Sequence, residues 1–234
     1  MPTLARRLTA EALGTFGLVF VGAAVVVVNG GFPNSGIGLL GIALAHAVVL
    51  SVMISATMTI SGGHLNPAVT IGLLVGRRID AASAVAYIIT QLAAAVVAAL
   101  LVKMLFPASA VRNAVLGVPV IASSVTLGQA IGLEAVLTFF LMTAVYGTAV
   151  SPDAPRVAGF GIGLVLLFDI LVGGPLTGAA MNPARAFGPA LVAGAWVGHL
   201  VYWIGPIVGA ILATLLWEYV LLPARGPHRR RTSD

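Results

Sequence analysis

The chain has 234 residues, of which 59% are hydrophobic and only 8% are charged, and its formal net charge is +5. Soluble domains carry about 25% charged residues, so this composition predicts a membrane protein and gives no indication of nucleic-acid binding. The sequence contains no Cys, which excludes disulfides, thiol catalysis and Cys-based metal sites.

Six apolar stretches are long enough to cross a bilayer, which takes about 20 helical residues. We expect spans at Leu8–Val28, Ile37–Met58, Ala81–Lys103, Leu127–Thr148, Val157–Gly173 and His199–Leu222. The first stretch is too long for a signal peptide and has Glu11 near its start, so it is expected to remain as a span. Residues 223–234 are expected to form a basic tail.

A tripeptide occurs twice, once between the second and third spans and once between the fifth and sixth. The two copies are Asn66, Pro67, Ala68 and Asn182, Pro183, Ala184. Asn is a favoured helix N-cap and Pro is favoured at the first helical position, so each copy predicts the start of a helix. Both helices are expected to be too short to span, the first ending about ten residues on, before Gly76, and the second by Pro189.

The two halves of the chain match each other, at about residues 8–103 and 127–222 of a single domain covering residues 1–234. Glu11 opens the first half and Glu134 opens the second in similar local sequences. Three spans per half invert the second half relative to the first, so the starts of the two short helices are predicted to meet at the membrane midplane. With both termini inside, nine of the twelve Lys and Arg residues lie on the inner face, which predicts cytoplasmic termini.

The segments SGGHLNPAVT and GAAMNPARAFGPA, together with the AEALGTF opening of the first span, resemble the aquaporin, or major intrinsic protein, family. The resemblance implies an all-α membrane protein with six transmembrane helices and two re-entrant half-helices in an inverted repeat. It also implies one pore per subunit, a homotetramer and no cofactor. The implied function is passive conduction of water and small neutral solutes such as ammonia, urea, glycerol or hydrogen peroxide, with exclusion of protons and ions.

The paired Asn residues are the first expected site residues. Each side-chain amide is expected to donate a hydrogen bond to a passing water while the helix start places positive potential at mid-pore, which interrupts a proton wire. The approaches to the two tripeptides are non-helical at membrane depth, so their carbonyls are expected to line a wet cavity. These residues are Gly62, Gly63, His64, Leu65, Gly178, Ala179 and Ala180.

Arg185 follows the second tripeptide directly, and an intramembrane cation is usually functional. In the family this position belongs to a narrow outer filter, and spacing from the tripeptides adds His46, Ile170 and Ala179. This set is similar to that of the plant tonoplast intrinsic proteins and departs from strict water channels. The filter is therefore expected to be wider and half apolar.

Glu11 and Glu134 are expected to brace the re-entrant loops, and Asp169 has no assigned role. Two alternatives stay open: a small-solute facilitator with incidental water flow, and a secondary transporter that uses these carboxylates. An enzyme is not expected, because the His residues are scattered and Cys is absent. The expected partners are water, small neutral solutes and the lipid bilayer, with no metal and no nucleic acid. Short loops favour a prokaryotic inner membrane.

Overall fold

The structure is a computed structural model that describes residues 2–223; the basic tail expected beyond Pro223 lies outside these residues. Within this range the protein is helical and contains no strand, and six helical segments are long and apolar enough to cross a membrane. They are Leu4–Gly31, Gly38–Ser61, Ala81–Leu105, Leu127–Val150, Phe160–Thr177 and Val201–Leu221. The six expected spans are confirmed, with ends that differ by a few residues.

The α-helices are α1 (Leu4–Gly31), α2 (Gly38–Ser61), α3 (Pro67–Val75), α4 (Ala81–Leu105), α5 (Ala108–Asn113), α6 (Leu127–Val145), α7 (Phe160–Gly163), α8 (Val165–Thr177), α9 (Pro183–Ala193) and α10 (Val201–Leu216). Two short 3-10 helices, η1 (Pro33–Ser35) and η2 (Val115–Gly117), lie in connections. Two π-helical turns, η3 (Tyr146–Val150) and η4 (Trp217–Leu221), extend α6 and α10.

Side-chain caps explain where several of the long helices begin. The Thr3 hydroxyl accepts a hydrogen bond from the Arg6 N–H at the start of α1. Thr126 and Gln129 form a reciprocal capping box at the start of α6. Asp80 caps α4, and the hydrogen bond from the Ser83 N–H holds the pKa of this carboxyl below its usual value.

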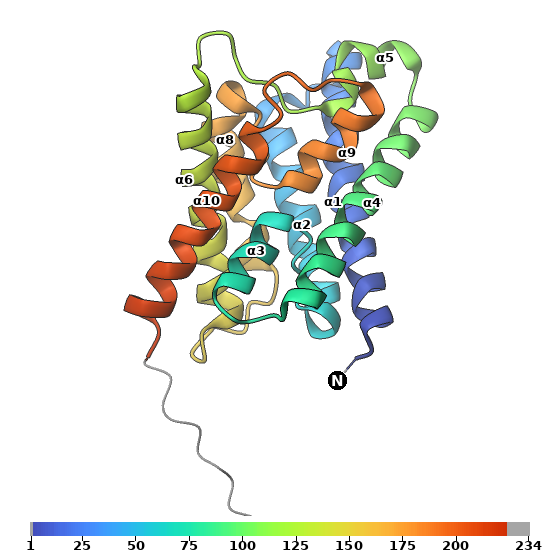
Figure 1. Cartoon of the computed structure of the whole chain (residues 1–234). Helices are drawn as coiled ribbons and strands as arrows, with labels where there is room; N and C mark the ends of the chain where they lie inside the picture. Colours follow the sequence, from blue (N-terminus) through green and yellow to red (C-terminus); the bar gives the residue numbers. More distant parts are fainter. Residues whose placement is uncertain (1, 224–234) are drawn as a thin grey trace, which may run out of the picture.

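The short helices α3 and α9 lie inside the bundle, one in each half, and point toward each other from opposite ends in Figure 1. Helix α3 has nine residues, as expected. The expected end of the second short helix at Pro189 is wrong, because α9 continues through Pro189 to Ala193 and ends at Gly194. A proline at this depth costs one helical N–H donor, and Gly194, with a φ of 70°, supplies the left-handed C-cap.

Small residues allow the spans to pack closely. Helix α10 packs along α6, and at Gly209 an added Cβ would collide with the backbone carbonyl of Ala135. Helix α9 approaches α4 in the same way at Gly188, against the carbonyl of Ala95. Close approach through small residues is the usual way in which helices associate in membranes. It packs α10 against α6 and α9 against α4.

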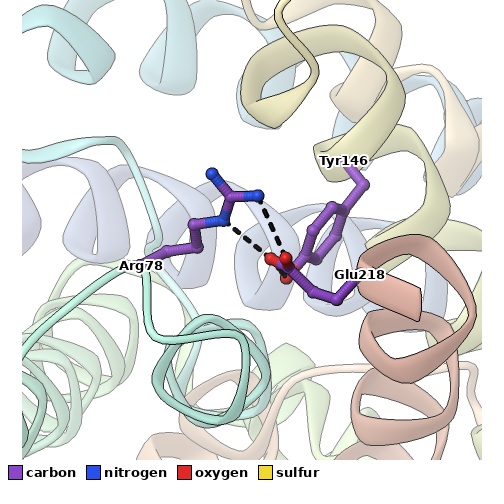
Figure 2. A network of polar contacts seen from close by, with 3 residues as sticks. All are labelled: Arg78, Tyr146 and Glu218. Atoms are coloured by element: carbon purple, nitrogen blue, oxygen red, sulfur yellow. Dashed lines mark hydrogen bonds and ion pairs between the residues drawn. The ribbon is translucent and has the colours of Figure 1, made fainter. Parts of the chain in front are cut away.

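A polar cluster ties the connection after α3 to the ends of α6 and α10 (Figure 2). Arg78 Nε donates to Glu218 Oε1 over 2.7 Å and a terminal guanidinium N–H donates to Oε2 over 3.1 Å. The Tyr146 hydroxyl donates to the same Oε1 at 2.9 Å, and its ring stacks on Trp217. The hydrogen bond to Glu218 raises the pKa of Arg78, so this guanidinium stays charged. The cluster ties the connection between α3 and α4 in the first half to the second half.

Candidate functional site

The two tripeptide Asn residues come together where α3 and α9 begin. In each, the side-chain oxygen caps its own helix: Asn66 Oδ1 accepts from the Ala68 N–H at 2.8 Å, and Asn182 Oδ1 accepts from the Ala184 N–H at 2.9 Å. The side-chain nitrogens cross to the other half, because Asn66 Nδ2 donates to the Met181 carbonyl and Asn182 Nδ2 donates to the Leu65 carbonyl, both at 2.9 Å. An amide nitrogen carries two N–H groups, so each Asn keeps one further donor.

Unusual backbone angles recur at matching places before the two tripeptides. Leu65 and Met181, each just before its Asn, have φ of 51° and 52°. Gly63 and Ala179, two residues earlier, have φ of 62° and 46°. A non-glycine residue in this region costs energy and persists only where its surroundings fix it. The matching strain in both halves therefore requires strong local anchors.

Glu11 is one such anchor, on α1. It is fully buried, and its two oxygens accept four hydrogen bonds. Oε1 accepts from the Ser61 hydroxyl at 2.7 Å and the His64 N–H at 3.0 Å. Oε2 accepts from the Leu65 N–H at 2.8 Å and from Gln91 Nε2 at 2.8 Å. Gln91 lies on α4, so this last bond is an interhelical hydrogen bond that joins the anchor to a third helix.

Glu134 is the corresponding anchor on α6. Its Oε1 accepts from the Thr177 hydroxyl at 2.7 Å and the Ala180 N–H at 3.0 Å, and its Oε2 accepts from the Met181 N–H at 2.7 Å. Each carboxylate therefore accepts hydrogen bonds from the backbone N–H groups of the two residues that directly precede the Asn in its own half of the chain. A buried carboxylate is stable only when its lone pairs are occupied in this way.

A narrow cavity runs past the paired Asn residues. It is lined by Leu18, His46, Leu50, Ile54, Gly63, His64, Asn66, Val69, Leu141, Val145, Ile162, Leu166, Ala179, Ala180, Met181, Asn182 and Arg185. The polar side chains in this set are two His, two Asn and one Arg; most of the others are aliphatic. The lining is thus an apolar wall with a few hydrogen-bonding groups.

Most of the lining residues are related in pairs by the inverted repeat. His46 and Ile162 lie equally far before Asn66 and Asn182, and Val69 and Arg185 lie equally far after them. The cavity therefore has two pseudo-equivalent ends. One carries His46 and Arg185, and the other carries Ile162 and Val69.

The apolar end was not predicted from the sequence. The spacing rule that gives the expected filter, applied to the other copy of the tripeptide, names Ile162, Ile54, Gly63 and Val69, and all four line the cavity. The inverted repeat in the sequence therefore contained the information needed to predict the apolar end.

Arg185 is held by two acceptors at its end of the cavity. Its Nε donates to His46 Nε2 at 3.3 Å, and its Nη1 donates to the Gly117 carbonyl at 2.9 Å. Because an arginine can only donate, His46 Nε2 must be an acceptor. The Nδ1 of His46 lies 2.9 Å from the Ile42 carbonyl and so carries the proton. His46 is therefore neutral, and both of its nitrogens are engaged.

The structure brings together most of the expected site residues. His46, Ala179, Arg185, both Asn residues, Gly63, His64 and Ala180 line the cavity. Ile170, Gly62, Leu65 and Gly178 are not among the lining residues. Ile170 is only 2% exposed and lies in the same apolar cluster as Ala179. Gly62 and Gly178 cap α2 and α8, and the Leu65 carbonyl accepts from Asn182.

Asp169 lies on α8 and is 1% exposed. Neither of its carboxylate oxygens has a hydrogen-bond partner within the described residues. It does not line the cavity. A buried polar group without partners is destabilising, so Asp169 contrasts with the fully bonded Glu11 and Glu134.

The comparisons with known proteins agree with this geometry. A family model described as "Major intrinsic protein" matches residues 1–217. The chain belongs to the major intrinsic protein family. The resemblance drawn from the two tripeptides is thereby confirmed. With its six membrane-crossing segments, this family member is an integral, multi-pass membrane protein.

Relatives in the family are similar over nearly the whole chain. Aquaporin TIP4-4 of Zea mays is 44% identical over 98% of this chain and 91% of its own length. Probable aquaporin TIP3-2 of Arabidopsis thaliana is 40% identical over 95% of this chain and 86% of its own length. The solved structure of the aquaglyceroporin from Plasmodium falciparum superposes with a TM-score of 0.82 at 24% identity, covering 93% of this chain and 97% of that one. At this identity the structural match confirms the aquaporin-like fold.

Proposed function

We propose that this protein is a passive channel that conducts water and small neutral solutes. The observation that supports this most directly is the cavity past two Asn side chains that are each fixed by one cap and one cross-link to the opposite half. Each Asn keeps an N–H that can donate to a passing water. The relatives named above are aquaporins, and the function is that of a channel and not of an enzyme.

Protons are excluded because water is oriented at the centre of the cavity. The N-termini of α3 and α9 carry positive partial charge and converge on the two Asn residues. A water that accepts from both Asn side chains turns its own hydrogens outward, so a continuous chain of proton transfer is broken there. The same potential repels cations.

The outer filter is proposed to consist of His46, Ile170, Ala179 and Arg185. Three of them line the cavity, and Ile170 enters by its sequence position while its side chain packs in the wall. Arg185 supplies donors to solutes and repels cations. Ala179 leaves room, so urea, ammonia, glycerol or hydrogen peroxide are the solutes expected besides water. Of the carbonyls expected along the path, those of Gly63, His64 and Ala180, which line the cavity, are proposed as further acceptors.

Glu11 and Glu134 are proposed to brace the re-entrant segments. All their observed partners are donors from the segments before the tripeptides, apart from Gln91. This arrangement argues against the secondary-transporter alternative, because carboxylates that carry protons or ions must exchange partners during a cycle.

We further propose that the chain is a single domain with both termini in the cytoplasm and that it assembles as a homotetramer. The termini are inferred from the bias of basic residues, and the tetramer from the family. The plant origin of the relatives conflicts with the expectation of a prokaryotic inner membrane, which rested on short loops. Because the chain has no Cys, single Cys variants at Ser124 and Ser151 test topology: an impermeant thiol reagent should label only Ser124→Cys in intact cells.

Stopped-flow light scattering on proteoliposomes tests the function. An osmotic gradient of an impermeant solute measures water, gradients of urea and glycerol measure solutes, and an internal pH dye measures ammonia. We expect fast water flow with a solute leak that His46→Phe abolishes. Fast water flow without any solute leak would restrict the function to water. A solute leak without fast water flow would favour the small-solute facilitator.

A further inference from the structure

Gly22 lies on α1 one helical turn beyond Leu18, which lines the cavity. It was not singled out from the sequence. A Cβ built on Gly22 would lie 2.5 Å from His46 Nε2 and 3.1 Å from Arg185 Nε. Real Cβ atoms essentially never approach another heavy atom closer than 3.0 Å. The two atoms that it would meet are the two ends of the hydrogen bond between Arg185 and His46.

Neither the His46 ring nor the Arg185 guanidinium can move away from an added methyl group without losing a hydrogen bond. The His46 ring is held from behind by the hydrogen bond from its Nδ1 to the Ile42 carbonyl. The Arg185 guanidinium is held by the Gly117 carbonyl, and both side chains are almost fully buried. In a close-packed interior one extra methyl group displaces its neighbours toward whatever space is open. Here the open space is the cavity that His46 and Arg185 line.

The inverted repeat shows what a side chain does at this position. Val145 on α6 lies as far after Glu134 as Gly22 lies after Glu11. The Val145 side chain lines the cavity at its apolar end, whereas at the other end the space beside Gly22 is filled by His46 and Arg185. The two ends of the cavity thus differ in whether this helix position carries a side chain.

We propose that Gly22 is a specificity-determining residue of the outer filter: its lack of a side chain lets His46 bind Arg185 against α1 and keeps the guanidinium away from the centre of the path. The inference rests on the proposed channel function. A side chain at this position breaks the bond between His46 and Arg185 and moves both groups into the cavity. The filter then narrows, so solutes larger than water are excluded first.

The test compares Gly22→Ala with Gly17→Ala in proteoliposomes that contain equal amounts of folded protein. Gly17 is the matched control because it is on the same helix and a Cβ there meets only the flexible side chain of Met53, at 2.9 Å from its sulfur. One methyl group at a steric filter discriminates by about tenfold, so Gly22→Ala should lower urea flow about tenfold relative to water flow. Gly17→Ala should conduct both like wild type.

The same substitution in a His46→Ala variant tests whether the effect of Gly22→Ala depends on the His46 ring. In His46→Ala the ring that the new methyl group meets at 2.5 Å is gone and only the 3.1 Å approach to Arg185 Nε remains, so adding Gly22→Ala should cause a much smaller loss than in wild type. A fall of equal size in that background would overturn the inference, and so would unchanged flow in Gly22→Ala itself.

A measurement that does not depend on transport can test the role of Gly22 separately from the proposed channel function. The ¹⁵N NMR spectrum of the His46 ring should show a protonated Nδ1 and a hydrogen-bonded Nε2 in wild type. The chemical shift of Nε2 should change in Gly22→Ala but not in Gly17→Ala. An identical Nε2 signal in all three proteins would refute the role of Gly22 even if no flow were detected. If liposomes with wild-type protein were no more permeable to water than empty liposomes, this result would instead contradict the channel function.

Discussion

Replacing Glu134 by Gln changes one acceptor oxygen into a donor at a site where the observed neighbours all donate. Its oxygens accept from the Thr177 hydroxyl and from the N–H groups of Ala180 and Met181. Whichever way the Gln amide turns, one backbone N–H faces an NH₂ group. An unpaired buried donor costs about 1–3 kcal/mol, and each remaining bond loses about 1 kcal/mol because its acceptor is no longer charged. The expected loss of stability is about 3–5 kcal/mol.

Glu11→Gln is the matched variant, and its expected cost is smaller. Gln91 Nε2 donates to Glu11, and Gln91 Oε1 has no hydrogen-bond partner within the described residues. A half-turn of the Gln91 amide would therefore offer this oxygen to the new NH₂ group. It would give up the 3.1 Å hydrogen bond from Gln91 Nε2 to the Thr70 hydroxyl, so the offset is less than about 1 kcal/mol. No such side chain reaches Glu134 among its observed partners.

Thermal unfolding of both variants in detergent measures the difference. Both should unfold at lower temperature than wild type, and Glu134→Gln should have the lower midpoint. The reasoning would be refuted if Glu134→Gln were as stable as wild type, because Glu134 would then have to carry a proton. An internal pH dye in proteoliposomes is the functional control, and neither wild type nor variant should move protons against a gradient.

Three further predictions concern other polar groups. Asp169→Leu should raise the unfolding temperature, because it removes a buried carboxylate without observed partners, and a decrease would show that Asp169 has a partner outside the described residues. Glu218→Gln should lower stability by about 1 kcal/mol, since Arg78 is partly exposed and the ion pair is screened, and equal stability would assign no energetic role to the pair. The pKa of Asp80 is lowered in the folded state, so its capping contribution is present at neutral pH and is lost as the pH falls through that depressed pKa. Acid should therefore destabilise wild type more than Asp80→Asn, and parallel acid profiles would contradict this.

The spans and the two short helices could be predicted from the sequence because their signals are local. Apolar length defines a span, and the Asn-Pro pair defines the start of each half-helix through cap chemistry. The end of α9 could not be predicted in the same way. Pro189 is a strong stop signal, but close packing of Gly188 against α4 keeps the helix going to Ala193.

The site was predictable wherever the repeat or a motif carried it. Arg185 and His46 were named from spacing, whereas the hydrogen bond from Arg185 to Gly117 was not, because Gly117 lies in a connection without a motif. Spacing also fixes a position along a helix without fixing what its side chain reaches. For this reason Ile54 lines the cavity while its counterpart Ile170 packs in the wall.

The central claim is that water crosses the membrane through the cavity between the two Asn residues. The most direct test is the osmotic water permeability of Ile162→Trp beside wild type. Ile162 lines the apolar end of the cavity and is 3% exposed, so an indole there should block the path. Ile89→Trp is the matched control, because Ile89 is 63% exposed on the outer surface of α4. The account predicts fast flow for wild type and Ile89→Trp, and flow near that of empty liposomes for folded Ile162→Trp. Unchanged flow in Ile162→Trp would mean that water takes another route, and this result would contradict the account.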